Sequence, residues 1–248
     1  MIRCCPMADW LTRDALDRLS DGIVITVGLT AITTVLALLL GGLLASARQS
    51  RSRGVRRASG AFVDVFRNVP ALVLIIFFAF AVPTVVPQSR RTGLFFDNWL
   101  WDALNEMTGI PIPYYAVAAT VALVANTGAH LAEVIRGGLS TVPSEEIESA
   151  RLLGAGRLRV WRSVTFPGAL RSSFPAVSSR LVHNMKNTAL ASLVAVPELF
   201  HSMQGEIARS FRATEFLTLV ALVYLGLAAV FSMTLERVET HLLRGRRG

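Results

Sequence analysis

Long apolar runs alternate with short basic runs along most of the 248-residue chain. About 20 consecutive apolar residues are needed to cross the hydrocarbon core of a bilayer as a helix. Residues 22–46 carry no charged side chain, and three further runs are nearly as apolar. This pattern predicts membrane-spanning helices at 22–46, 69–86, 114–132 and 216–235.

A fifth crossing, at residues 169–196, is predicted from charge and not from hydropathy. The segment before it and the chain's C-terminal tail are both basic, so both should lie on the same side of the membrane. One clean span at 216–235 cannot satisfy this condition alone, so 169–196 must cross as well. A re-entrant or interfacial hairpin is the alternative, because Arg180, His183 and Lys186 are costly at membrane depth.

Basic residues set the expected orientation. Five arginines follow the first span, at positions 48, 51, 53, 56 and 57, and further arginines follow the third span and the last one. Cytoplasmic loops of membrane proteins are enriched in lysine and arginine. We therefore expect a multi-pass membrane protein with its N-terminus outside and its C-terminus inside.

Composition agrees with a membrane protein. Mean hydropathy is +0.50 and 52% of residues are hydrophobic, too apolar for an ordinary soluble domain. The net charge of +8 would suggest a nucleic-acid partner if the protein were soluble. Here the basic residues flank apolar runs, so no nucleic-acid partner is expected.

Two segments outside the spans are also assigned. Asp9–Leu19 is expected to form an interfacial helix, and the tryptophan-containing linker 87–113 is expected to lie outside. Cys4 and Cys5 are adjacent and give no disulfide framework.

Residues 136–170 form a polar island in this apolar chain. Ser144 is a candidate N-cap, and Glu145 and Glu146 suit the positive end of a helix dipole. Gly154 and Gly156 are stop signals. The pattern predicts a helix at about 145–153, and a second helical run, about 157–166, that ends at Pro167.

The spacing within this island resembles the EAA loop of ATP-binding cassette (ABC) importer permeases. Glu148-Ser149-Ala150 is followed by Gly154 and then by Val164-Thr165-Phe166-Pro167. The resemblance implies the type I permease fold, all-α with about five spans, in a bacterial inner membrane. It also implies a cytoplasmic loop at 137–168 that docks on an ATPase. The implied coupling residues are Ser144, Glu145, Glu146, Glu148, Ser149, Ala150, Gly154 and Pro167. A basic, amphipathic surface loop of another membrane protein is the alternative.

Three shorter elements resemble the polar amino acid uptake permeases: Arg67-Asn68-Val69-Pro70, Glu133 to Gly138, and Lys186 to Leu190. With these, the resemblance covers roughly residues 20–240. It implies that Glu133, Arg136, Arg67 and Pro70 set the geometry of the loop, although Glu133 and Arg136 could equally form a plain interfacial ion pair. Glu198, in a further matching element, is expected at the outer mouth.

Polar groups at membrane depth mark a candidate substrate path. Lys186 is the only lysine, and Asn187 stands where the family has an aspartate, so the site is more positive than the family pattern. An unpaired ammonium would favour an anionic partner such as a substrate carboxylate, whereas a structural contact to backbone carbonyls is the alternative. The expected path residues are His183, Asn184, Lys186, Thr188, Asn126 and His130.

The function implied is that of a single-domain permease subunit, residues 1–248, which imports a polar or charged amino acid or a related small solute. Its implied partners are an ABC ATPase dimer that carries ATP and Mg²⁺, a second permease chain, an extracytoplasmic solute-binding protein and the bilayer. The chain shows no phosphate-binding loop and no metal-ligand spacing, so we expect neither catalysis nor a cofactor or metal on this chain. A non-transporting scaffold or sensor is the alternative, and a membrane enzyme is less favoured.

Overall fold

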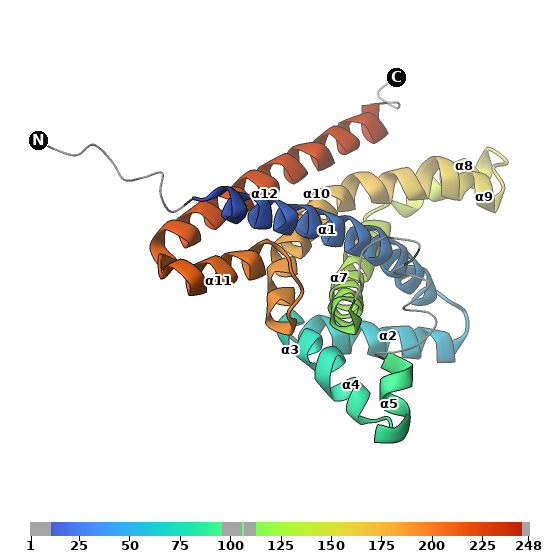
Figure 1. Cartoon of the computed structure of the whole chain (residues 1–248). Helices are drawn as coiled ribbons and strands as arrows, with labels where there is room; N and C mark the ends of the chain where they lie inside the picture. The colour runs from blue at the N-terminus through green and yellow to red at the C-terminus, as the bar shows by residue number, and fades with distance from the viewer. Residues whose placement is uncertain (1–10, 96–105, 107–112, 245–248) are drawn as a thin grey trace, which may run out of the picture. The chain divides into compact units, whose positions relative to one another are not determined.

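The computed structural model describes residues 11–95, 106 and 113–244, and every regular element within these ranges is helical (Figure 1). The all-α fold is therefore confirmed. Cys4, Cys5 and the linker tryptophans lie outside the described residues. The α-helices are α1 (Arg13–Ala47), α2 (Arg53–Asn68), α3 (Ala71–Ile76), α4 (Val82–Thr84), α5 (Gln88–Phe95), α7 (Tyr114–Ser140), α8 (Ser144–Leu152), α9 (Arg157–Val160), α10 (Phe166–Asn187), α11 (Leu199–Ser210) and α12 (Ala213–Arg244).

Three described helices are long and apolar enough to cross a membrane: Arg13–Ala47, Tyr114–Ser140 and Ala213–His241. A fourth is added if α2 and the segment Ala71–Thr84 count as one broken span. The three helices contain the predicted spans 22–46, 114–132 and 216–235. The predicted span 169–196 is α10 followed by a 3₁₀ helix, Thr188–Val194, and its crossing stays a prediction.

The expected interfacial helix at Asp9–Leu19 is not a separate element. Its described part is continuous with the first span, because α1 runs without a break from Arg13 to Ala47. Part of its apolar side is covered by protein, since Ala15 and Leu19 pack against Leu199 and Met203, while Leu16 is 46% exposed. This part of the amphipathic pattern therefore reflects packing against α11.

The second helical run does not end at Pro167, contrary to the prediction. A π turn, Trp161–Thr165, leads directly into α10, so Pro167 lies inside a continuous helical segment. The same arrangement precedes Pro83, where the π turn is Phe77–Ala81. In both places the residue before the proline donates its N–H to the carbonyl five residues back. A widened turn of this kind accommodates a proline, which lacks an N–H and crowds the preceding turn.

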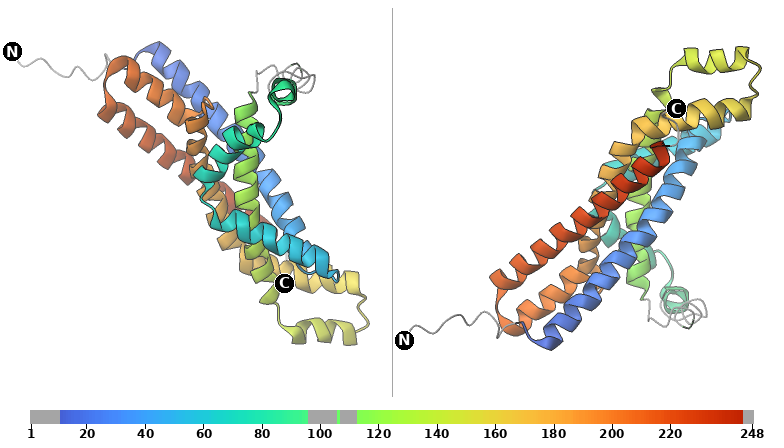
Figure 2. Two further views of the ribbon diagram at one scale, coloured as in Figure 1. Left: turned by 90° about the horizontal axis from the view of Figure 1, so that it is seen from below. Right: turned by 90° about the horizontal axis from the view of Figure 1, so that it is seen from above.

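The chain divides into two compact units, and each is described by itself. The first unit comprises the described parts of 1–33, 70–123 and 184–228. In it α11 packs beside the first half of α1 and the first half of α12 (Figure 2). The core of this packing is Ala15, Leu19, Leu199, Met203, Phe216 and Val220.

A buried carboxylate, Glu198, joins the three helices of this packing. It is the N-cap of α11, and its side chain accepts hydrogen bonds from the backbone N–H groups of Phe200 (2.9 Å) and His201 (2.8 Å). The hydroxyl of Tyr224 on α12 donates to the same carboxylate at 2.7 Å. Glu198 is 0% exposed, so it is a buried cap, and its position at an outer mouth stays a prediction.

A second carboxylate, Glu206, is held by two arginines. Arg18 of α1 donates to it at 2.6 Å and Arg209 donates at 2.7 Å. The hydrogen bond from Arg18, together with Arg209, lowers the pKa of Glu206 despite its burial. These ion pairs fix the start of α1 against α11.

The second unit comprises 34–69, 124–183 and the described part of 229–248. Its apolar core joins α1, α7 and α10 through Ala37, Leu131, Val177 and Leu181. Gly41 of α1 lies so close to α7 that a β-carbon there would be 2.7 Å from Cβ of Leu131. Small residues at helix contacts are the usual means of close packing in membranes. There the hydrophobic effect does not drive helix association, and van der Waals contact takes its place. This unit carries the whole EAA-like loop.

Candidate functional site

Helix α8 begins one residue before its predicted start. Pro143, with extended backbone angles of φ −60° and ψ 136°, is the N-cap, and no side chain caps the helix. Ser144 is the first helical residue, so its prediction as a capping side chain was wrong. The fixed φ of proline suits this position, and a capping hydroxyl is not needed. Glu145 and Glu146 lie in the first turn, as predicted.

The end of α8 is a turn that requires glycine. Gly154 has φ +80°, which is the left-handed region that other residues rarely adopt. Its N–H donates to the carbonyl of Arg151 (2.9 Å), and the N–H of Ala155 donates to the carbonyl of Ala150 (3.0 Å). This pair of bonds is a Schellman motif. Gly156, predicted as a second stop signal, instead has φ −62° and is the N-cap of α9.

The tip of the loop, defined as residues 144–160, presents most of its side chains to solvent. No residue of α8 is buried. Leu152 and Leu153 are each 89% exposed, and Leu158 is 68% exposed. Glu145, Glu146, Glu148 and Ser149 are also exposed. Large apolar side chains that are exposed together are typical of a surface that another protein covers.

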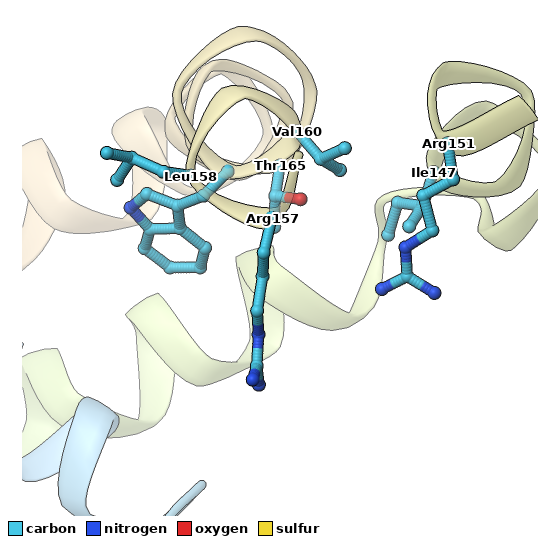
Figure 3. A pocket seen from close by; sticks show the side chains of 7 residues that line it. Ile147, Arg151, Arg157, Leu158, Val160 and Thr165 are labelled. Carbon is cyan, nitrogen blue, oxygen red and sulfur yellow. The ribbon is translucent and has the colours of Figure 1, made fainter. Parts of the chain in front are cut away.

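The two sides of the tip enclose a hollow of about 460 Å³. Figure 3 shows Ile147 and Arg151 on one helix and Arg157, Leu158, Val160 and Thr165 on the other. Trp161 completes the lining. In Figure 2, α8 lies beside the helical run that begins with α9. The tip is thus a short helical hairpin with an open space between its arms.

The base of the loop, defined as residues 138–142 and 168–173, is tightly packed. A β-carbon at Gly138 would lie 2.7 Å from Cβ of Ser173 and 2.8 Å from the carbonyl oxygen of Ala169. The hydroxyl of Thr141 donates to the hydroxyl of Ser172 at 2.7 Å. The chain leaving α7 and the chain entering α10 are therefore held together where the loop begins and ends.

An ion-pair network lies just before the base. Glu133 pairs with Arg136 one turn later on α7, as predicted, and also with Arg48 at the end of α1, at 2.6 Å. The structure thereby ties the first span to the helix that leads into the loop. Pro70 is the N-cap of α3, and Arg67 is in the last turn of α2. Whether these four predicted residues govern loop geometry stays a prediction.

The predicted path residues do not share one environment. Asn126 is buried and donates to the carbonyls of Phe66 (2.8 Å) and Val69 (3.3 Å). Asn184 is buried and donates to the hydroxyl of Thr33 at 2.8 Å. The buried hydroxyl of Thr188 donates to the carbonyl of Met185, in the last turn of α10.

Three other predicted path residues are more accessible. His183 and Lys186 are exposed on α10, and His130 is half-buried on α7. Arg180 was expected at membrane depth but was not among the candidate path residues, although a charged residue in that segment points to a functional site.

No group of three or more histidines, cysteines, aspartates or glutamates gathers to hold a metal ion within the part of the chain that the structure describes.

Comparison with known proteins identifies the family. The family described as "Binding-protein-dependent transport system inner membrane component" matches residues 22–245. The chain belongs to this family. The permease is thus a multi-pass component of the inner membrane, and the EAA-like loop lies within the matched range.

Curated relatives cover nearly the whole permease. The octopine transport system permease protein OccM of Rhizobium radiobacter is 28% identical over 92% of this chain and 87% of its own length. The glutamine transport system permease protein GlnP of Escherichia coli strain K12 is 28% identical over 91% of this chain and 93% of its own. HisM of Salmonella typhimurium, a histidine/lysine/arginine/ornithine permease, is 29% identical over 90% and 86%.

Solved structures support the fold. A chain of an amino acid ABC transporter crystallised with histidines matches with a TM-score of 0.73 and 22% identity, over 92% of this chain and 95% of that one. A chain of the inward-facing MetNI methionine ABC transporter matches with a TM-score of 0.65 and 18% identity, over 93% and 99%. The type I permease architecture expected from the loop is therefore confirmed.

Proposed function

We propose that the permease is the membrane subunit of an ABC importer for a polar or charged amino acid, or for a closely related small polar solute. The family match over residues 22–245 and the amino acid and opine permeases among its relatives support this substrate class. An extracytoplasmic binding protein delivers the solute, and a second permease chain, identical or homologous, completes the pathway.

The observation that carries the proposal is the contrast within the loop. Helix α8 has no buried residue and presents Leu152 and Leu153 at 89% exposure, whereas the base at Gly138 and Ser173 is tightly packed. A partner that binds the tip can move the flanking helices only if the base transmits the displacement. The partner is an ABC ATPase dimer, which binds ATP and Mg²⁺ itself.

The coupling residues follow from this role. Glu145, Glu146 and Glu148 provide charge for the ATPase contact, and the small Ser149 and Ala150 allow close approach. Gly154 fixes the direction in which the chain leaves α8. Differential binding of the ATPase to two states of the permease then shifts the population between them. In this arrangement the loop and the C-terminus lie in the cytoplasm and the N-terminus lies outside.

The test is uptake by the complete transporter, reconstituted with its ATPase and binding protein in liposomes. Glu148→Lys and Gly154→Val should each abolish ATP-driven uptake while the binding protein keeps its affinity for the solute. Glu236→Lys, an exposed carboxylate on α12, is the matched charge control and should keep uptake. Uptake that survives both loop variants would contradict coupling through α8. A permease that copurifies with no ATPase would instead favour a scaffold or sensor.

A further inference from the structure

Four basic side chains gather near the end of α2, and they come from three helices. Arg67 is in the last turn of α2, His130 is on α7, and Arg180 and His183 are on α10. His130 interacts electrostatically with each of the other three. All four belong to the second compact unit. We call this group the basic cluster.

A hydrogen-bonded asparagine fixes one member of the basic cluster in place. Arg180 Nη2 donates to Asn126 Oδ1 at 2.5 Å. The amide nitrogen of Asn126 donates to the backbone carbonyls of Phe66 and Val69, on either side of Arg67. Asn126 is only 4% exposed, so its amide is a fixed bracket between α10 and the end of α2. The guanidinium of Arg180 is thereby held beside the segment that carries Arg67.

The positive charge of the basic cluster is not balanced within the described residues. Neither Arg67 nor Arg180 forms an ion pair with a carboxylate of that part of the chain. Glu133 interacts electrostatically with Arg67, but its own ion pairs are with Arg48 and Arg136. Glu133 is therefore already shared by two other arginines. Asp64, one turn before Arg67 on α2, is exposed and forms no ion pair with it.

One donor of the basic cluster also lacks an acceptor. Arg180 Nε is buried and makes no hydrogen bond to any described residue. A guanidinium has five N–H donors in a planar fork, which matches the two oxygens of a carboxylate. Leaving a buried charged donor unsatisfied is costly, and intramembrane arginines are characteristically paired. If residue 180 served only to bind Asn126, one neutral donor would be enough there. Such a structural role also does not explain why three further basic groups lie nearby.

We propose that Arg67, His130, Arg180 and His183 bind a carboxylate of the transported solute, so that the permease favours anionic solutes, such as acidic amino acids, over cationic ones. This inference rests on the proposed import of a polar solute and names its charge. An acidic amino acid brings a second carboxylate to the basic cluster, whereas a basic amino acid brings a like charge that the cluster repels.

Binding to the permease–ATPase complex in lipid nanodiscs tests the inference without the selectivity of the binding protein. The probes are radiolabelled L-glutamate, L-glutamine and L-lysine, which are similar in size and differ in charge. We expect glutamate to bind about tenfold or more tightly than glutamine, as one charge-assisted pair allows, and lysine to bind most weakly.

Variants separate a direct role from a structural one. Arg180→Gln and Arg67→Gln should each remove the preference for glutamate. The hydrogen bonds of Asn126 go to Phe66, Val69 and Arg180, so Arg67→Gln removes none of them. Arg180→Lys keeps the charge and should keep part of the preference. Arg237→Gln, an exposed arginine on α12, is the matched control and should bind as the unmodified protein does. Thermal unfolding of each variant shows whether it is folded.

Three results would overturn the inference: tighter or equal binding of glutamine or lysine by the unmodified complex, unchanged glutamate binding in both Arg67→Gln and Arg180→Gln, or no binding of any probe. ATP-driven uptake by the complete transporter distinguishes these results from failure of the proposed function. Uptake of a neutral or basic amino acid would leave the importer intact and reject only the anionic site. If the complete system takes up no polar amino acid, the proposed function fails as well.

Discussion

The tip and the base of the loop are adjacent in sequence and opposite in character. At the tip, α8 has no buried residue and ends at Leu152 and Leu153, which are each 89% exposed. At the base, a single added methyl group on Gly138 would lie within 3 Å of two neighbouring atoms. This difference is what the proposed coupling requires, since a partner needs an accessible tip and the displacement needs a tightly packed base.

The largest expected effect comes from breaking the base. Gly138→Leu places a side chain against the carbonyl of Ala169 and Cβ of Ser173, so α7 and α10 must separate. Overpacking of a tight contact costs about 1–3 kcal/mol, and here backbone is involved. We expect a large loss of thermal stability in detergent and of folded yield. Gly137→Leu is the control, because no atom lies within 4 Å of its added β-carbon. Equal stability of the two variants would contradict a tight base.

Changing the tip should remove function and leave the fold intact. Leu152→Asp combined with Leu153→Asp alters two solvent-exposed side chains, so stability should change by less than about 0.5 kcal/mol. An exposed apolar surface that contacts the ATPase would be lost, and we expect loss of ATPase copurification and of uptake. Copurification at the unmodified level would exclude these leucines from the contact.

Two carboxylates show the same difference between packed and exposed regions. Glu206 is clamped by Arg18 and Arg209, which lower its pKa, whereas Glu148 on the tip forms no ion pair within the described residues. A lowered pKa means that Glu206 stabilises the fold above the unfolded-state pKa and that this stabilisation is lost as the pH falls through the folded-state value.

We therefore expect Glu206→Gln to lower the melting temperature at about pH 7 and to have little effect at about pH 3, below the ordinary glutamate pKa. Melting curves of the purified permease at both pH values are the measurement. Glu148→Gln is the exposed control and should leave the melting temperature nearly unchanged. A Glu206→Gln effect of equal size at both pH values would show that lost packing, not charge, is responsible.

The smallest effect is expected at Ser144. Its hydroxyl caps nothing, because Pro143 occupies the N-cap position, so Ser144→Ala should change stability by only a few tenths of a kcal/mol. Glu198→Ala is the comparison, since that side chain does cap α11 and its loss should cost about 1 kcal/mol or more. Thermal unfolding of both variants decides whether the two helix starts differ in this way.

Local signals in the sequence predicted the loop well. The acidic first turn and the left-handed Gly154 are properties of a few neighbouring residues, and α8 begins and ends within one residue of its predicted bounds. The helix end predicted at Pro167 was wrong because a π turn accommodates the proline. A turn of that kind has no residue pattern from which it could be predicted. The interfacial helix failed because its partner, α11, is about 180 residues away in sequence.

The candidate path shows what polarity alone cannot resolve. Asn126, Asn184 and Thr188 were chosen as polar groups at membrane depth, and each is buried with a hydrogen-bond partner inside its own unit. Arg180 was just as polar, but its missing acceptor became visible only when Asn126 and the end of α2 were placed beside it. A shortage of acceptors is a property of the assembled fold.

The π turn at Trp161–Thr165 also determines the direction in which α8 faces. It holds one more residue than an α-helical turn at that height. If the same five residues were wound as regular α-helix, everything before Trp161 would rotate by about 100° around the helix axis relative to Ala169. The two exposed leucines would then point in a different direction, so the orientation of the proposed docking surface depends on one residue of chain length.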